Sequence, residues 1–373
     1  MNFTFPREIE DFRNEVRTFL EPYAELDGYL GQGAVWPQVR ALFQAMGERG
    51  WLSLAWPRAL GGEARGPAWE YVLWDEVAYA RAARNPLSAG IVARSLIRSG
   101  SEAQRARWLP PIRSGELHFS LAYSEPEAGS DLAAVQVRAQ REGETYVISG
   151  QKCWQSYAQD MDCFWLLART GEPDSRARGL SLFICEKDRE GVRVDPLPTL
   201  DGDQLNEVYF DEVRLPEDHR VGPENEAWGI MAEALADERH IQFPPGRVRR
   251  DLEEMIQWLD EAGIRRNDWV DKVLGDLAVE VEEVEMHGLL VLDAMEKGRS
   301  AVSAAAANKV AHTLASQHIA RAIVELGGPM AITAGARPET LWLQSLWETI
   351  GGGTTEIMRG IVARDVLSLS ARR

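Results

Sequence analysis

The stretch Ala122-Tyr-Ser-Glu-Pro-Glu-Ala-Gly-Ser-Asp131 stands where a predicted strand runs out into a loop. Ser124 offers a hydroxyl group, while Gly129 and Ser130 offer backbone N–H groups that a ligand can approach closely. Such a loop can hold an anionic pyrophosphate, because its amides and hydroxyls are hydrogen-bond donors. On spacing alone, a plain turn built on Asp or Ser side chains remains the alternative interpretation.

Short predicted strands surround this stretch, from about residue 118 to residue 223. Val135 and Val137 lead into the polar turn Arg141-Glu-Gly-Glu144, and Thr145-Tyr-Val-Ile148 begins the return strand of a hairpin. An antiparallel sheet or barrel is the expected architecture. Further strands are predicted at Cys163-Phe-Trp-Leu-Leu-Ala168, Leu180-Ser-Leu-Phe-Ile-Cys185 and Val208-Tyr-Phe210.

Helical patterns flank this strand-rich region on both sides. Ile9, Phe12 and Val16 recur at helical spacing near the N-terminus, and residues 270–295 and 301–326 carry the same periodicity later in the chain. The order is helices, sheet, helices, so the expected fold class is mainly α with a central β domain. We expect an N-terminal helical domain at 1–117, a middle β domain at 118–225 and a C-terminal helical domain at 226–373.

The composition excludes several classes of protein. The chain has 373 residues with 41 Lys and Arg against 58 Asp and Glu, a formal charge of −17. This acidic balance disfavours nucleic-acid binding. No stretch is apolar over the roughly 18 residues that a membrane span needs, so no membrane association is expected. The three cysteines lack C-x-x-C spacing, which predicts a reducing, cytoplasmic setting. The six histidines are scattered, so no metal site is expected.

A second motif, Gly150-Gln-Lys-Cys-Trp-Gln-Ser156, follows the hairpin. Trp154 and Ser156 lie two residues apart, so on a strand they would point to one face. The indole can then lie against a planar cofactor while the hydroxyl bonds its edge. A Trp packed in the core is the alternative for this motif by itself.

A third motif, Ile350-Gly-Gly-Gly-Thr-Thr-Glu356, is a glycine-rich turn before a predicted helix. Thr354 or Thr355 is the expected N-cap, which would leave N–H groups exposed at the positive helix end. An ordinary capped helix start is the alternative. The turn lacks the G-K-[ST] ending of a Walker loop.

These three motifs, in this order and in this frame, resemble the acyl-CoA dehydrogenase family of flavoproteins. The resemblance covers nearly the whole chain and implies FAD as cofactor, with a middle antiparallel β-barrel or sheet and a C-terminal four-helix bundle. It implies that Leu121, Tyr123 and Ser124 meet the flavin ring and that Trp154 and Ser156 flank it. The phosphates of FAD or CoA would meet Gly129 and Ser130, and the adenosine half of FAD would meet Thr354 and Glu356.

The resemblance also raises the question of the catalytic base. Many family members carry a Glu directly before the Gly-Thr of the C-terminal motif, where this chain has Gly352. Another branch places the base before an Arg, which matches Glu238 and Arg239 here. A helical wheel sets Glu238 beside the apolar stripe of Trp228, Met231 and Leu235, with Asp237 turned away. We therefore expect Glu238 to be the base and Arg239 to contact the substrate; a structural salt bridge of Glu238 is the alternative.

Two departures refine what the resemblance implies. The Arg…Phe-Gly segment typical of the family is missing where this chain reads Trp258-Leu-Asp-Glu-Ala-Gly-Ile-Arg-Arg-Asn267, and Pro244-Pro245 is expected to end the helix soon after Glu238. This pattern resembles the bacterial subgroup acting on branched or steroid-side-chain CoA esters, some of which pair non-identical subunits.

The expected activity is FAD-dependent α,β-dehydrogenation of a bulky or branched acyl-CoA thioester to its trans-2-enoyl-CoA. The expected partners are an electron-transfer acceptor protein and further subunits, in a homotetramer or in a heterotetramer with a homologous subunit. Two alternatives stay open: a non-catalytic or half-site subunit that supports the flavin of a homologous partner, and an oxidase that uses oxygen.

Overall fold

The computed structural model describes residues 4–24, 26–28, 32–238 and 240–369. The chain divides into two compact units. We call Met1–Leu30, Gly66–Arg84 and Arg239–Arg373 the bundle unit, and Gly31–Arg65 and Asn85–Glu238 the sheet unit. The predicted three-part division at residues 117 and 225 follows element type and stays a prediction.

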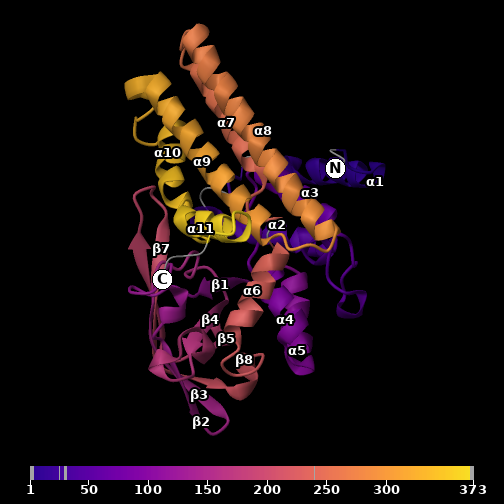
Figure 1. Ribbon diagram of the computed structural model, residues 1–373, viewed down its shortest axis with the longest axis vertical. Coiled ribbons are helices and arrows are strands. Elements are labelled where there is room, and N and C mark those ends of the chain that lie inside the picture. The colour runs from indigo at the N-terminus through magenta and orange to yellow at the C-terminus, as the bar shows by residue number, and fades with distance from the viewer. Residues whose placement is uncertain (1–3, 25, 29–31, 239, 370–373) are drawn as a thin grey trace. The chain divides into compact units, whose positions relative to one another are not determined.

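The described residues form helices and strands in the predicted order, helices first, then strands, then helices (Figure 1). The helices are α1 (Arg7–Leu20), α2 (Gln32–Glu48), α3 (Pro67–Tyr79), α4 (Ala93–Ser99), α5 (Glu102–Arg113), α6 (Ala227–Glu238), α7 (Pro245–Glu261), α8 (Asp268–Glu296), α9 (Val302–Gly327), α10 (Arg337–Glu348) and α11 (Thr355–Asp365). The strands are β1 (Phe119–Ala122), β2 (Arg138–Glu142), β3 (Thr145–Lys152), β4 (Cys163–Arg169), β5 (Leu180–Glu186), β6 (Val192–Pro198), β7 (Gln204–Pro216) and β8 (Arg220–Val221).

The sheet unit is built on an eight-stranded sheet. Seven strands have the order β6-β7-β3-β2-β4-β5-β8, and β1, the eighth, pairs with β4. The predicted hairpin is confirmed: β2 and β3 pair antiparallel around Gly143, whose φ of 65° suits glycine in the turn. The predicted antiparallel pairing holds for most neighbours, but β1 and β2 both run parallel to β4. One sheet face buries an apolar core that includes Tyr146, Phe164 and Phe183.

Helix α6 belongs to the sheet unit and packs on α4, on β5 and on the π-helical turn Ser88–Val92. Its buried positions are Ala227, Ile230, Met231 and Ala234, three or four residues apart as one helix face requires. The predicted stripe was therefore wrong about Trp228, which is 45% exposed, because the buried face is rotated toward Ala227. Glu238, at the end of α6, continues this buried face.

The bundle unit is made of long helices that run side by side (Figure 1). Helices α7, α8 and α9 share one apolar core, and α10 and α11 both pack on α9. Helix α3 joins them by packing on α7 and α8. The prediction that the helix ends soon after Glu238, ahead of Pro244-Pro245, is confirmed: α6 ends at Glu238, and α7 begins at Pro245. Within the described ranges, no helix combines the length and apolar character needed to cross a bilayer.

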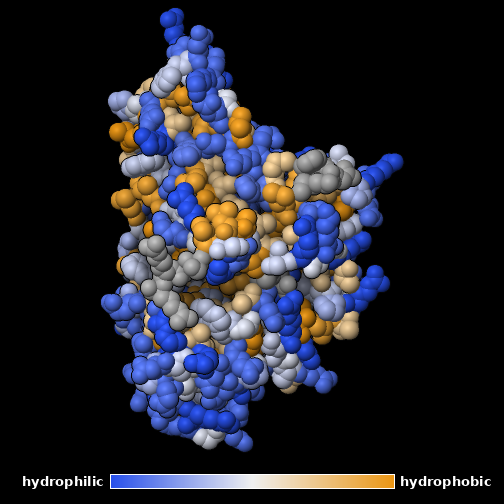
Figure 2. All heavy atoms as spheres, in the orientation of Figure 1, coloured by the Kyte–Doolittle hydropathy of each residue, from blue (hydrophilic) through white to orange (hydrophobic). Residues whose placement is uncertain are grey.

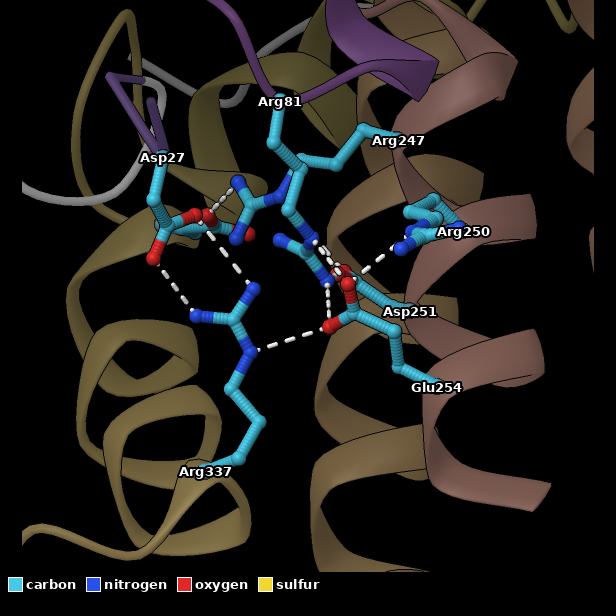
Figure 3. Close-up of polar contacts among 8 residues, drawn as sticks. Asp27, Arg81, Arg247, Arg250, Asp251, Glu254 and Arg337 are labelled. Atoms are coloured by element: carbon cyan, nitrogen blue, oxygen red, sulfur yellow. Dashed lines mark hydrogen bonds and ion pairs between the residues drawn. The ribbon is translucent and has the colours of Figure 1, made fainter. Parts of the chain in front are cut away.

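A buried network of ion pairs ties distant segments of the bundle unit together (Figure 3). Arg81, which follows α3, pairs with Asp251 and Glu254 of α7. Arg337, at the start of α10, donates to Glu254 at 2.9 Å and to Asp27 at 2.7 Å. Burial opposes the charge of Glu254, but Arg81 and Arg337 outweigh it and lower the pKa of this carboxyl. The network fixes α7 against α10 and against the loop after α3.

We expect Arg81→Met to lower the free energy of unfolding by up to about 3–5 kcal/mol, because buried Asp251 loses the nearer of two cations and keeps Arg247 at 3.5 Å. Urea denaturation followed by helical circular dichroism measures this loss. Arg321→Met is the matched control: Arg321 is 75% exposed in a pair with Glu325, so the cost is at most about 1 kcal/mol. Equal effects of the two substitutions would contradict a stabilising role for the buried network.

Candidate active site

Two of the predicted cofactor-binding segments lie side by side in the sheet unit. The chain leaves β1 at Ala122, and the following carbonyl groups bond to the end of β3. The Tyr123 carbonyl accepts a hydrogen bond from Lys152 Nζ at 2.8 Å, and the Ser124 carbonyl accepts one from the Cys153 N–H at 3.0 Å. The backbone next to Leu121 is therefore fixed against the motif that contains Trp154.

A fully buried ion pair holds this junction together. Lys152 Nζ lies 2.8 Å from Glu125 Oε1, and both side chains are buried. The Glu125 carboxylate also accepts hydrogen bonds from the Val137 N–H at 2.8 Å and the Gln136 N–H at 2.6 Å. Burial lowers the pKa of Lys152 to about 8, although Glu125 opposes this shift. One carboxylate thus organises three segments of the chain.

Trp154 and Ser156 lie beyond the end of the strand, so the predicted strand placement was wrong. Strand β3 ends at Lys152, and Trp154 has a φ of 67°, an unusual conformation for an aromatic residue. Buried Gln155 lies between them and donates to the Cys153 carbonyl at 2.6 Å. Trp154 and Ser156 are both exposed, Trp154 at 55%, while Gln155 is buried. This exposure excludes the alternative of a core Trp.

The loop after Ser124 leaves its glycine and serine open. Glu125 and Ala128 form a tight turn through mutual backbone hydrogen bonds. Beyond this turn Gly129 and Ser130 are exposed, and a Cβ added to Gly129 would meet no atom within 4 Å. Backbone amides in such an open loop are accessible to an anionic group.

Glu238 is fully buried at the C-terminal end of α6. Its Oε1 accepts a hydrogen bond from Asn85 Nδ2 at 2.7 Å. Tyr123 lies near enough for the Glu238 charge to affect it: burial raises the pKa of the phenol, and Glu238 adds to that rise. Arg239 lies outside the described residues, and the side chain of Asp237 is likewise not described.

The glycine-rich turn and its helix belong to the bundle unit. Thr354 is the N-cap of α11, and its hydroxyl accepts from the Ile357 N–H at 3.3 Å, which confirms one of the two predicted caps. Glu356 lies exposed in the first turn of α11. Gly352 has a φ of 69°, and a Cβ there would lie 3.6 Å from the Phe243 ring. Buried Lys309 of α9 donates to the Gly353 carbonyl and holds the turn in place.

Sequence reasoning missed the residues that support the predicted ones. The sequence shows Glu125 and Lys152 inside the quoted motifs, but nothing in their spacing indicates that they pair. Asn85 is 153 residues away from Glu238, and only its position before Pro86 marks it as a restricted turn residue. Among the described residues, no group of His, Cys, Asp and Glu is arranged to hold a metal ion.

A separate groove lies between α8, α9 and α11 in the bundle unit, with a volume of about 420 Å³. Its walls are apolar residues such as Val310, Leu314 and Val362, with Glu280 and His287 at the side of α8. Figure 2 shows hydrophobic side chains gathered around α11 on the visible face. None of the predicted site residues lines this groove.

Comparison with known proteins shows which family has this architecture. Three family models match in chain order: the acyl-CoA dehydrogenase N-terminal domain over residues 6–116, the middle domain over 120–213 and the C-terminal domain over 225–367. Acyl-CoA dehydrogenase FadE26 of Mycobacterium tuberculosis is 32% identical and is aligned over 99% of each chain. This chain belongs to the acyl-CoA dehydrogenase family. It is accordingly an FAD-dependent oxidoreductase that acts on CH–CH bonds.

Solved structures support the same assignment. The Tcur3481-Tcur3483 steroid ACAD matches with a TM-score of 0.91 and 28% identity over the full length of both chains. The ChsE4-ChsE5 complex from Mycobacterium tuberculosis matches with a TM-score of 0.89 and 31% identity over the same extent. This chain is thus similar over its whole length to acyl-CoA dehydrogenases solved as two-component assemblies.

The residues of this family member fit FAD. An exposed indole held in an unusual backbone conformation beside fixed carbonyl groups suits a flat ring system, and such strain is typical of functional positions. The open amides at Gly129 and the exposed hydroxyl of Ser130 suit a phosphate. When bound, FAD supplies the acceptor for a hydride.

We expect Glu125→Gln in this acyl-CoA dehydrogenase to lower the free energy of unfolding by about 3–5 kcal/mol, because Lys152 is left buried without a counter-charge. Replacing both partners, in Glu125→Gln with Lys152→Met, should restore most of this stability. A double-mutant cycle by urea denaturation measures the coupling. Additive losses would show that the pair does not hold the junction.

We expect Trp154→Ala to weaken FAD binding about tenfold, the size of the contribution of one aromatic contact. Trp269→Ala is the matched control, because Trp269 is equally exposed, at 57%, on α8 and lies in no predicted site. Flavin absorbance after dialysis at a series of FAD concentrations gives both affinities. An unchanged affinity in Trp154→Ala would remove this residue from the proposed FAD site.

Proposed function

We propose that this chain catalyses the α,β-dehydrogenation of an acyl-CoA thioester to the trans-2-enoyl-CoA. In the proposed reaction Glu238 takes the proton from the α-carbon of the thioester. Bound FAD would supply the acceptor for the hydride of the β-carbon; with the proton and the hydride removed, the Cα–Cβ single bond would become a double bond, and the Glu238 carboxylate would keep the proton.

The observation that carries this proposal is the buried carboxylate at the end of α6. Glu238 is fully buried, and a neutral amide, Asn85, holds one of its oxygens. A partly desolvated carboxylate is the type of base that this chemistry uses, because burial raises its affinity for a proton. The other position at which family members carry the base is Gly352, which has no side chain.

The remaining site residues take supporting roles in this proposal. Leu121, Tyr123 and Ser124 would contact the flavin ring, with Trp154 and Ser156 flanking it. Exposed Gly129 and Ser130 would meet the phosphates of FAD or CoA, and Ser130 and Arg239 the substrate. Thr354 and Glu356, at the N-terminus of α11, would meet the adenosine half of FAD.

We propose a bulky or branched acyl group, such as a steroid side chain, for the substrate. The support is the similarity to a structure described as a steroid ACAD, together with a base on α6 rather than before the glycine turn. Isovaleryl-CoA and a CoA ester of a steroid with a propionate side chain are the two probes that this proposal selects. Anaerobic titration of the FAD-loaded chain with each ester should bleach the flavin absorbance.

We expect Glu238→Gln to retain FAD but to bleach at least about a hundredfold more slowly, because a general base contributes about 10²–10⁴ to the rate. Glu233→Gln is the matched control: Glu233 lies on the same helix but is 61% exposed. Stopped-flow flavin reduction measures both variants. Full turnover in Glu238→Gln would remove Glu238 as the base.

A second candidate function is a half-site subunit that completes the flavin site of a homologous partner. Two observations favour it: the solved ChsE4-ChsE5 relative is a complex of two named components, and the Arg…Phe-Gly segment is absent here. At that place, Arg266 pairs with Asp260 and Asp271 at 3.6 Å. A chain that purifies without flavin and acquires it only with a homologous subunit would select this function.

The electron acceptor belongs to the same proposal. We propose that the electron acceptor is an electron-transfer protein. We also propose that the chain assembles as a homotetramer or as a heterotetramer with a homologous subunit. The apolar groove between α8, α9 and α11 supports assembly, because exposed apolar surface of this kind is typical of protein contacts. Comparing hydrogen peroxide yield with dye reduction separates a dehydrogenase from an oxidase.

A further inference from the structure

Asn85 and Glu238 come from distant parts of the chain but meet inside the sheet unit. Asn85 Nδ2 donates to Glu238 Oε1 at 2.7 Å, and the carboxylate is fully buried. We propose that Asn85 and Gly90 are positioning residues for the Glu238 base: the amide orients the carboxylate, and the glycine makes the space that it occupies. This inference rests on the proposed function of Glu238 and concerns two residues for which the sequence analysis predicted no role.

The position of Asn85 is restricted by its own sequence. Pro86 follows it directly, and a residue before proline is confined to extended conformations. The Pro86 carbonyl then accepts from the N–H groups of Ala89 and Gly90, both at 3.1 Å. The side-chain amide of Asn85 is therefore presented from a stiff segment.

Gly90 lies in the π-helical turn Ser88–Val92, which contacts α6. A Cβ built on Gly90 would lie 2.3 Å from Glu238 Oε1 and 2.6 Å from its Cδ, far closer than carbon and oxygen atoms pack. Any larger residue at this position would push the carboxylate aside. π-Helical turns are rare and are often found at functional sites, because the extra residue shifts the backbone locally.

An amide is suited to hold a base. As a neutral donor, Asn85 favours the ionised carboxylate, which is the form that accepts a proton, without introducing a competing charge. An ammonium or guanidinium group in its place would favour the ionised form so strongly that the carboxylate would become a weak base. The Asn85 amide thus restores part of the hydrogen bonding that burial removes from Glu238.

Several titratable and charged groups lie near Glu238. His240, two residues later in the chain, is buried and lies 3.1 Å from Glu70. The Tyr123 phenol has its pKa raised by burial and by Glu238, so it stays protonated through neutral pH. Helix α4, which packs on α6, carries Arg94 and Arg98. Arg98 lies 3.5 Å from Glu233 on the outer part of α6. These groups are unchanged in the Asn85 variants, so a displacement of the acid limb between wild type and those variants reports the effect of Asn85 on the base.

The test compares flavin reduction by isovaleryl-CoA and by the steroid-propionyl-CoA ester across pH in FAD-loaded wild type, Asn85→Leu and Asn85→Asp. Asn85→Leu keeps the size of the side chain but loses the donor, so the acid limb of kcat/KM should move up by about one pH unit. Asn85→Asp adds a negative charge beside the Glu238 carboxylate and should move the acid limb to still higher pH. A purely structural role for Asn85 would change stability and leave the limb in place.

Gly90→Ala provides a second variant that does not depend on the donor. We expect it to keep FAD and the wild-type melting temperature within a few degrees while kcat falls at least tenfold, because the flexible end of Glu238 moves to make room. Glu233→Gln is the control that should leave both kcat and the pH profile unchanged.

The outcomes separate this inference from the proposed function. If Glu238→Gln is inactive but Asn85→Leu keeps the wild-type acid limb and Gly90→Ala keeps the wild-type kcat, the positioning roles are wrong and the base assignment stands. If Glu238→Gln turns over normally, or the FAD-loaded wild type is bleached by neither ester, the proposed function fails and this inference fails with it.

Discussion

The buried ion pair between Glu125 and Lys152 fixes the part of the chain from which the cofactor site is built. Its carboxylate accepts two backbone N–H groups from residues 136 and 137, and its ammonium group donates to the Tyr123 carbonyl. A buried charge is stable only where ionic and hydrogen-bond partners replace the lost water, so these contacts hold the loop after β1 in one conformation. Trp154 is exposed at a defined place because Lys152, two residues earlier, is anchored inside.

The base of the proposed reaction is also a buried carboxylate, and a neutral amide donates to one of its oxygens. Glu238 is buried by the packed face of α6, and Asn85 supplies the donor that burial would otherwise deny it. The two carboxylates differ in consequence. Glu125 pairs with the buried cation Lys152 and has a structural role, whereas Glu238 is assigned to proton transfer in the proposed reaction.

The fold followed from local patterns because those patterns involve neighbouring residues. The hairpin was predictable from apolar runs around Gly143, the start of α11 from Thr354, and the break after Glu238 from Pro244-Pro245. The prediction that Trp154 lies on a strand was wrong, because the strand end depends on a contact with a residue outside its motif. Strand β3 ends when Lys152 turns inward to meet Glu125, and Gln155 then holds the next turn.

By itself, the sequence determined the order of helices and strands and the family resemblance, and it marked Glu238 as the candidate base. These depend on periodicity, on breakers and on short motifs, all of which are local. Only the tertiary structure decided that α6 buries Ala227 rather than Trp228, that β1 runs parallel to β4, and that Asn85 and Gly90 enclose Glu238. Such contacts join residues up to 153 positions apart, and they form because packing and the desolvation of charge act on whatever the fold brings together.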